Sequence, residues 1–369
     1  MRILFVLPGM HKVNRGAEVA FESIGRLIAE GGEHEVTLLG AGQPRDGEPY
    51  TYKHVGCVPR ERFVKWPTFP GMRSHFSWEE LTFAASALPR YRGRDYDLTV
   101  TCSFPYVHWL LQGRPARRRP AHVFVTQNGD WPAYANNSEY RFFKADGLIC
   151  TNPEFYERNH EKWFARLIPN GVDEARFHPG EGDRAALGLP EDQQLVLMVT
   201  EVSNGKRALE GIRSVAKLKD VGMVIAGDGP QAAEAEALAA ELMPGRFHRL
   251  YVPHHQMPEI YRCADAFLHM AHYEPFGIVY IEALASGLPV IAHDNVVTQW
   301  ILGEHGRLVD TNDFDLVAKQ LEAALEPDAA GAMEARVASA RERFSLRSVA
   351  AEYQRFFEDT VAHRSGAAS

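Results

Sequence analysis

The chain has 369 residues, of which 45% are hydrophobic and 24% are charged, as in folded globular proteins. These values exclude wholesale disorder, a collagen-like repeat and a small disulfide scaffold, and the net charge of -8 argues against a general nucleic-acid binder. The length predicts two domains. The charge is uneven, because residues 1–170 hold 22 Lys and Arg against 18 Asp and Glu, whereas the remainder holds 18 against 30.

The first half of the chain alternates between strand and helix signals. Continuous apolar runs predict buried strands at residues 2–7, 35–40, 98–102, 122–127 and 147–151. Between the first two runs, Val19, Ile24 and Ile28 share a stripe that predicts a helix over 17–30. Continuous apolar strands separated by helices indicate a parallel sheet that is covered on both faces.

The second half repeats this pattern after a Gly- and Pro-rich junction at 171–190. Strands are predicted at 195–200, 222–227, 250–252, 266–271, 289–294 and 307–310. Helices are predicted at 207–218, 231–242, 256–263, 277–286, 297–302, 313–326 and, in several pieces, 331–362. We therefore expect two doubly wound α/β domains with a cleft between them, and ligands beyond the carboxyl ends of the strands.

Cysteine usage and hydropathy predict a cytoplasmic protein. Cys57, Cys102, Cys150 and Cys263 show no CxxC spacing, and the last three lie in or beside apolar runs, as expected for reduced thiols. The apolar run 3–7 is too short for the core of a signal peptide. No apolar stretch approaches the ~18 residues that a membrane-spanning helix needs.

Two cations follow the predicted strand 195–200. Lys206 and Arg207 stand where a helix begins, a position that disfavours positive charge because of the helix dipole. An anionic ligand between these side chains and the helix amides would explain them. The alternative is a solvated Lys-Arg pair.

The segment 272–291 contains more candidate site residues than any other part of the chain. Glu274 precedes a helix that is predicted to start near Phe276, so that the free amides of Phe276, Gly277 and Ile278 could bind a diphosphate. Glu282 lies one to two turns into this helix, and carboxylates accept hydrogen bonds from sugar hydroxyls. The spacing of the two glutamates alone carries little information, and an acidic helix start is the alternative for Glu274. The added Pro-Phe-Gly and the later Ala-x-Gly-x-Pro make the segment specific.

With these motifs the chain resembles the retaining, nucleotide-sugar-dependent glycosyltransferases of family 4, which have the GT-B fold. The matching stretches run in family order along nearly the whole chain: Arg15–Glu18, Ile168–Asp173, Lys206–Arg207, Gly227–Pro230, Glu274–Ile291 and Gly306–Asp310. The resemblance implies two Rossmann-like domains that face each other across a cleft. It places an acceptor domain at 1–172, joined by a C-terminal helix at about 346–369 that crosses back, and a donor domain at 173–345.

The resemblance also implies a set of site residues. Glu274, Lys206 and Arg207 would serve catalysis. The nucleotide sugar would contact Gly16, Asn204, Lys206, Arg207, His254, Glu274, Pro275, Phe276, Gly277, Ile278 and Glu282. The resemblance implies no metal and no cofactor, since the nucleotide diphosphate sugar is a co-substrate.

The first half is expected to bind the acceptor through Asn128, Asp130 and Trp131. Its loops are rich in aromatic residues that suit sugar rings or a lipid carrier: Phe63, Trp66, Phe69, Phe76, Trp78, Trp131, Tyr134, Tyr140, Phe142 and Phe143. Arg114 and Arg117–Arg119 could meet phosphate or anionic lipid at the inner face of the membrane. Core packing for the aromatic residues and a solvated loop for the arginines are the alternatives.

The predicted function is transfer of a hexose from a UDP- or GDP-sugar to a glycan, glycolipid or small glycosylated acceptor, as in polysaccharide biosynthesis. Two departures from the family pattern leave alternatives open. Glu201 stands near the place of a common arginine, and Asn128 stands near that of a common histidine. These departures motivate one alternative, a non-catalytic nucleotide-sugar-binding scaffold, and a sugar-nucleotide epimerase is a second, enzymatic alternative.

Overall fold

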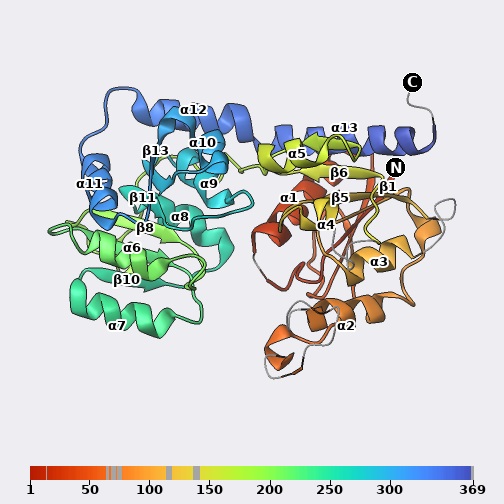
Figure 1. Ribbon diagram of the computed structural model, residues 1–369, viewed down its shortest axis with the longest axis horizontal. Coiled ribbons are helices and arrows are strands. Elements are labelled where there is room, and N and C mark those ends of the chain that lie inside the picture. Colours follow the sequence, from red (N-terminus) through yellow and green to blue (C-terminus); the bar gives the residue numbers. More distant parts are fainter. Residues whose placement is uncertain are drawn as a thin grey trace. The chain divides into compact units, whose positions relative to one another are not determined.

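The computed structural model describes residues 1–13, 15–63, 66–67, 72, 77–113, 119–135 and 142–366. The chain folds into two compact units, Met1–Gly171 with Leu346–Ser369, and Val172–Ser345. Each unit is built on one parallel sheet with helices on both faces, which confirms the predicted doubly wound α/β class (Figure 1).

The first unit has a seven-stranded sheet in the order β3-β2-β1-β4-β5-β6-β7. Its strands are β1 Arg2–Val6, β2 Glu35–Gly40, β3 Thr51–His54, β4 Leu98–Thr101, β5 Ala121–Val125, β6 Gly147–Cys150 and β7 Ala165–Leu167. The sequence analysis missed β3 and β7, the two edge strands. Both are short and lack fully buried residues, so neither presents the apolar run that marks the inner strands.

Helices cover both faces of this sheet. They are α1 Gly16–Glu30, α2 Ser77–Ala87, α3 Tyr106–Gln112, α4 Trp131–Tyr134, α5 Pro153–Asn159 and α13 Leu346–Arg364, with short 3₁₀ turns η1 Arg60–Phe63 and η2 Gly93–Asp95. Successive residues of β1 point to opposite faces: Ile3 and Phe5 join the core under α1 and α13, whereas Leu4 and Val6 join the core under α2 and α3. This two-sided burial explains the uninterrupted apolar run.

The second unit has a six-stranded sheet in the order β10-β9-β8-β11-β12-β13. Its strands are β8 Leu195–Val199, β9 Gly222–Ala226, β10 Phe247–Leu250, β11 Ala266–His269, β12 Val290–His293 and β13 Gly306–Val309. The strand predicted at 250–252 was wrong in position. Edge strand β10 pairs only with β9, from Phe247 opposite Met223 to Leu250 opposite Ala226, and Tyr251 beyond it is 82% exposed.

The helices of this unit also lie on both faces of its sheet. They are α6 Ala208–Val215, α7 Ala232–Leu242, α8 Met257–Arg262, α9 Ile278–Ala285, α10 Val296–Leu302, α11 Phe314–Leu325 and α12 Ala332–Phe344, with 3₁₀ turns η5 Ala185–Leu187, η6 His254–Gln256 and η7 Gly303–His305. Leu195 and Leu197 of β8 pack in one core, and Val196 and Met198 pack in the other. Two apolar layers therefore sandwich the sheet.

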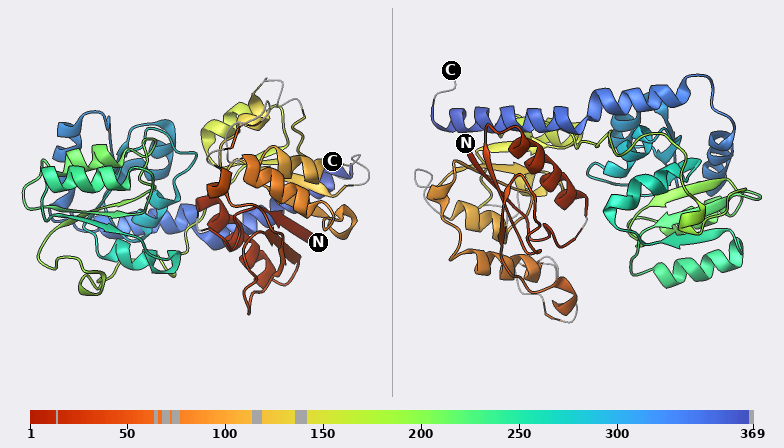
Figure 2. Two further views of the ribbon diagram at one scale, coloured as in Figure 1. Left: turned by 90° about the horizontal axis from the view of Figure 1, so that it is seen from below. Right: turned by 180° about the vertical axis from the view of Figure 1, so that it is seen from behind.

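The C-terminal helix α13 belongs to the first unit, as predicted (Figures 1 and 2). Its Tyr353, Phe356 and Phe357 are fully buried in the core that β1 and α1 share. The predicted helical stretch 331–362 is interrupted at Ser345, whose backbone leaves the helical region and forms a bridge with Val172. The chain thus leaves the first unit at 171–172 and returns to it at 345–346.

Cysteine chemistry and helix hydropathy agree with the sequence. All four cysteines are free thiols, and Cys102, Cys150 and Cys263 are buried. Among the residues that the structure describes, no helix has both the length and the apolar character required to cross a bilayer.

Candidate functional site

In the second unit, the carboxyl ends of the central strands bring together two charged residues that were predicted from sequence. Lys206 lies in the loop after β8, and Glu274 lies in the loop after β11, the neighbouring strand. Their side chains form an ion pair between Lys206 Nζ and Glu274 Oε1. Residues 68 positions apart therefore meet where an open parallel sheet binds its ligands.

Glu274 is held as a carboxylate although only 11% of its side chain is exposed. Burial by itself would raise its pKa, but the hydrogen bond from His269 and the charge of Lys206 outweigh burial and lower the pKa to about 2. His269 Nε2 lies 3.3 Å from Glu274 Oε1. The site thus keeps a desolvated negative charge that can accept hydrogen bonds from ligand hydroxyl groups.

Arg207 contacts residues in the loops after β11 and β13. Its guanidinium donates to Asn312 Oδ1 at 2.9 Å and to the Thr311 carbonyl at 3.3 Å, and it contacts the His272 ring. Burial and the charge of Arg207 lower the pKa of His272. Arg207 adopts a left-handed backbone conformation with φ 59°, so the turn before α6 directs its side chain across the sheet edge. In this structure, Arg207 therefore connects the loop after β11 with the loop after β13.

Helix α9 begins at Ile278, one residue after the start of the predicted range 277–286 and two residues after Phe276. Gly277 is its N-cap with φ 81°, and Ile278 is the first helical residue. The left-handed backbone of Gly277 delays the helix, so the free amides begin after Phe276. Phe276 is 2% exposed and packs edge-on against Trp300, so its side chain belongs to the core. Pro275, Gly277 and Ile278 are partly exposed.

Glu282 is buried within α9, with 7% exposure. It accepts a hydrogen bond of 2.7 Å from the hydroxyl of Tyr261. Burial raises the pKa of Glu282 to about 7, against the lowering effect of that hydrogen bond. The carboxyl group therefore sits close to its titration point near neutral pH.

Three other residues predicted for the donor lie in or beside loops. Asn204 is exposed in the turn that precedes α6. His254 begins η6, and its side chain is outside the part of the chain that the structure describes. Gly16 is the first residue of α1 in the first unit and is exposed, with Arg15 as the extended N-cap.

The residues predicted for the acceptor follow β5 in the first unit. Asn128 lies 3.7 Å from Cys102 Sγ. Asp130 is 3% exposed; its Oδ2 accepts from Asn159 at 2.8 Å and pairs with Arg158 at 2.9 Å. Burial raises the pKa of Asp130 despite these partners. Asp130 thus anchors helix α5 to the end of β5.

The aromatic residues predicted for the acceptor divide into buried and exposed ones. Phe63 and Phe143 are buried, whereas Trp66, Tyr134 and Phe142 are 52%, 44% and 68% exposed. Trp131 packs edge-on against Phe104 with ring centroids 5.4 Å apart. Trp78 lies in α2 and stacks on Phe63. Phe69, Phe76 and Tyr140 lie outside the described residues.

Within the predicted arginine cluster, only Arg119 is among the described residues. It forms an ion pair of 2.5 Å with Asp146, which Arg364 of α13 also contacts at 2.7 Å. Asp146, which precedes β6, therefore joins Arg119 to Arg364 of the C-terminal helix. Arg114, Arg117 and Arg118 lie outside the described residues.

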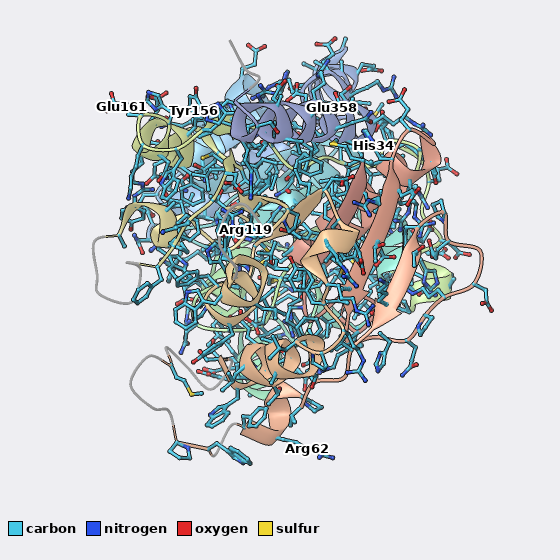
Figure 3. The ribbon with its side chains drawn as sticks, turned by 90° about the vertical axis from the view of Figure 1, so that its right-hand side faces the viewer. His34, Arg62, Arg119, Tyr156, Glu161 and Glu358 are labelled. Atoms are coloured by element: carbon cyan, nitrogen blue, oxygen red, sulfur yellow. The ribbon has the colours of Figure 1, made fainter. Side chains whose placement is uncertain are left out.

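One group of described residues has the spacing of metal ligands, although the sequence predicted no metal. Ligand atoms of Glu33, His34 and Glu358 lie within 4.8 Å of one another. His34 and Glu358 lie side by side in Figure 3, and His34 Nε2 is 3.3 Å from Glu358 Oε1. This contact between His34, which precedes β2, and Glu358 of α13 accounts for the approach of the two side chains.

Sequence reasoning missed the histidines of the site. His269 ends β11, and His272 and His293 follow or end neighbouring strands, with ring centroids of the latter pair 4.4 Å apart. One signal could have revealed His269, since it is the polar residue in the otherwise apolar run 266–271.

The comparisons with known proteins concern the family and the fold of the chain. Residues 181–343 match the family described as "Glycosyl transferases group 1". A lipopolysaccharide core biosynthesis glycosyltransferase of Rhizobium meliloti is 28% identical over 204 residues, which are 54% of this chain and 58% of that protein. Other curated relatives match over 44% and 39% of their length. The chain thus spans about half the length of these relatives.

Solved structures share the fold over almost the whole chain. Sucrose-phosphate synthase from Thermosynechococcus elongatus superposes with a TM-score of 0.78 at 19% identity, covering 98% of this chain and 99% of that one. Anabaena Alr3699/HepE in complex with UDP-glucose gives 0.76 at 17% identity, covering 97% and 100%. The two Rossmann-like units therefore have the GT-B fold.

Proposed function

We propose that this GT-B protein, whose residues 181–343 match the group 1 glycosyl transferases, transfers a hexose from a nucleotide diphosphate sugar to an acceptor hydroxyl. The Lys206–Glu274 pair at the carboxyl ends of β8 and β11 carries the proposal. It puts a fixed cation and a fixed hydroxyl acceptor where this fold class binds ligands. Val172–Ser345 would bind the donor, and the first unit would bind the acceptor.

The proposed chemistry uses charges that are already in place. Breaking the sugar–phosphate bond puts negative charge on the departing diphosphate, which the ammonium of Lys206 and the N-terminal amides of α9 would stabilise. Glu274 would accept hydrogen bonds from hydroxyls of the donor sugar, and Glu282 would accept them from the ribose diol. Arg207 would act on the diphosphate once its contacts with Thr311 and Asn312 are released, or else only hold these loops.

We propose the retaining, metal-independent mechanism of family 4 for this chain. The acceptor would attack from the face that the diphosphate leaves, and the departing phosphate oxygen would take the acceptor proton. This route requires no second carboxylate as a nucleophile, in contrast to retaining glycosidases.

The proposed donor is a UDP- or GDP-sugar, and the proposed acceptor is a glycan, a glycolipid or a small glycosylated molecule. The similarity to a glycosyltransferase of lipopolysaccharide core biosynthesis and to a structure with UDP-glucose supports these classes. Exposed Trp66, Tyr134 and Phe142 support an amphipathic acceptor at the inner face of the membrane. Asn128, Asp130 and Trp131 would line or support that acceptor site.

Donor binding and nucleotide release test the proposal. The protein would be incubated with UDP-, GDP- and dTDP-sugars, with and without EDTA, while thermal stability and released nucleoside diphosphate are measured. We expect the sugars of one nucleotide class to raise the thermal stability of the protein. With acceptor present, the same sugars should release nucleoside diphosphate, both with and without EDTA. No response to any of the sugars would refute the proposal, and conversion of the donor sugar without acceptor would indicate an epimerase instead.

A further inference from the structure

Two buried polar side chains, Tyr280 and His269, lie behind Glu274 of the proposed donor site. Tyr280 of α9 contacts His269 at the end of β11, and His269 contacts Glu274. Tyr280 is fully buried and His269 is 2% exposed. Such a polar chain inside an apolar core needs specific hydrogen bonds to offset its desolvation.

The hydrogen bonds around His269 define its tautomer. The backbone N–H of Ala271 lies 3.4 Å from His269 Nδ1, and a backbone N–H can only donate. His269 Nδ1 must therefore be an acceptor, and the hydroxyl of Tyr280, 3.1 Å away, donates to it as well. The ring proton accordingly resides on Nε2, which lies 3.3 Å from Glu274 Oε1.

The two oxygens of Glu274 are used unequally. Both Lys206 and His269 address Oε1. Among the described residues, no hydrogen bond or ion pair involves Oε2. A carboxylate whose one oxygen is fixed from two sides presents the other in a defined direction.

We propose that His269 is a positioning residue for Glu274: with a proton on Nε2, it fixes Oε1 and leaves Oε2 to accept a hydroxyl of the donor sugar. The inference rests on the proposed function, because it assigns Glu274 to the sugar. Tyr280 holds the tautomer from behind. Because His269 is 2% exposed and lies against Glu274, its effect on the donor would pass through Glu274.

Two substitutions separate the hydrogen bond from simple packing. His269→Leu keeps an apolar side chain of similar size without a donor, whereas His269→Gln carries an N–H₂ group near the place of Nε2. Loss of a hydrogen bond to a charged group corresponds to about a tenfold to hundredfold change. We expect His269→Leu to lower kcat/KM for the nucleotide sugar by that amount, and His269→Gln to recover most of it.

Binding of the free nucleoside diphosphate gives a readout that general damage would move. We expect its Kd to change less than about twofold in His269→Leu, because Glu274 is assigned to the sugar and not to the nucleotide. His248→Gln, in edge strand β10, serves as the matched control and should leave both quantities unchanged. If His269→Leu fails to fold, His269→Asn replaces it, since its shorter side chain cannot reach Glu274.

A double-mutant cycle decides the outcome. In the Glu274→Gln background, His269→Leu should cause little further loss, because the group that it positions is already changed. Losses that multiply, or a His269→Gln variant as impaired as His269→Leu, would overturn the inference. If Glu274→Gln itself left a confirmed transfer activity unchanged, the proposed function of the site would fail instead. If only His269→Leu were silent, this inference alone would fail.

Discussion

Replacing Glu274 by glutamine should remove a pH-dependent part of the stability of the protein. In the folded state the pKa of Glu274 is about 2, against 4.5 for an unperturbed glutamate, and this difference corresponds to about 3 kcal/mol of unfolding free energy. The pKa is lowered on folding, so the stabilisation is complete above about pH 5 and is lost as the pH falls toward 2. By the same relation, roughly 1 kcal/mol is lost at pH 4 and roughly 2 kcal/mol at pH 3.

Urea unfolding of the full chain at several pH values measures this effect. Wild type should exceed Glu274→Gln in stability by up to about 3 kcal/mol at pH 7, and the difference should shrink to about 1 kcal/mol at pH 3. Glu326→Gln at the exposed end of α11 is the matched control, and its difference from wild type should stay near zero. A difference for Glu274→Gln that stays constant from pH 7 to pH 3 would refute the assignment of Lys206 and His269 as the groups that hold this carboxylate ionised.

Three further predictions concern the same unit. Lys206→Met should lower kcat by about 10²–10³-fold in a donor-turnover assay, because it removes the cation assigned to the leaving group, while Lys206→Arg should retain part of the activity. Gly277→Ala should destabilise the protein by at least about 1 kcal/mol in thermal unfolding and weaken nucleotide binding, since φ is 81° and a Cβ would lie 2.4 Å from the Tyr280 ring. Tyr261→Phe should raise the pKa of Glu282 above about 7, because the lost hydrogen bond favours the ionised form; an unchanged pH profile of nucleotide affinity would contradict this.

The inner strands of both sheets could be predicted from the sequence because they are buried on two faces. Leu195–Val199 contributes alternate residues to two cores, so every position along it is apolar. Edge strands lack this signal. Thr51–His54 is mostly exposed, and Phe247–Leu250 is half-buried along its length, so the first was missed and the second was displaced by about three residues.

Lys206 and Glu274 were predicted as site residues from motifs, but the contacts that these side chains make could not be predicted. A motif of a few residues is enough to identify Glu274, which precedes a helix, and Lys206, which follows a strand and stands where a helix begins. His269 approaches Glu274 Oε1 only because the loop after β11 folds back toward the end of that strand. The hydrogen bond from Arg207 to Asn312 joins residues 105 positions apart. Motif spacing along the chain contains no such distances.

By itself the sequence determined the fold class, and its motifs predicted the segment that is proposed for the site. It did so because apolar periodicity and turn-forming residues are patterns of neighbouring residues, which the sequence shows directly. Only the tertiary structure decided that α9 begins after Gly277, that Arg207 binds neighbouring loops, and that Glu274 is ionised through Lys206 and His269. Charge state and hydrogen-bond partner depend on burial and on distances between remote segments, and these exist only once the sheet has assembled.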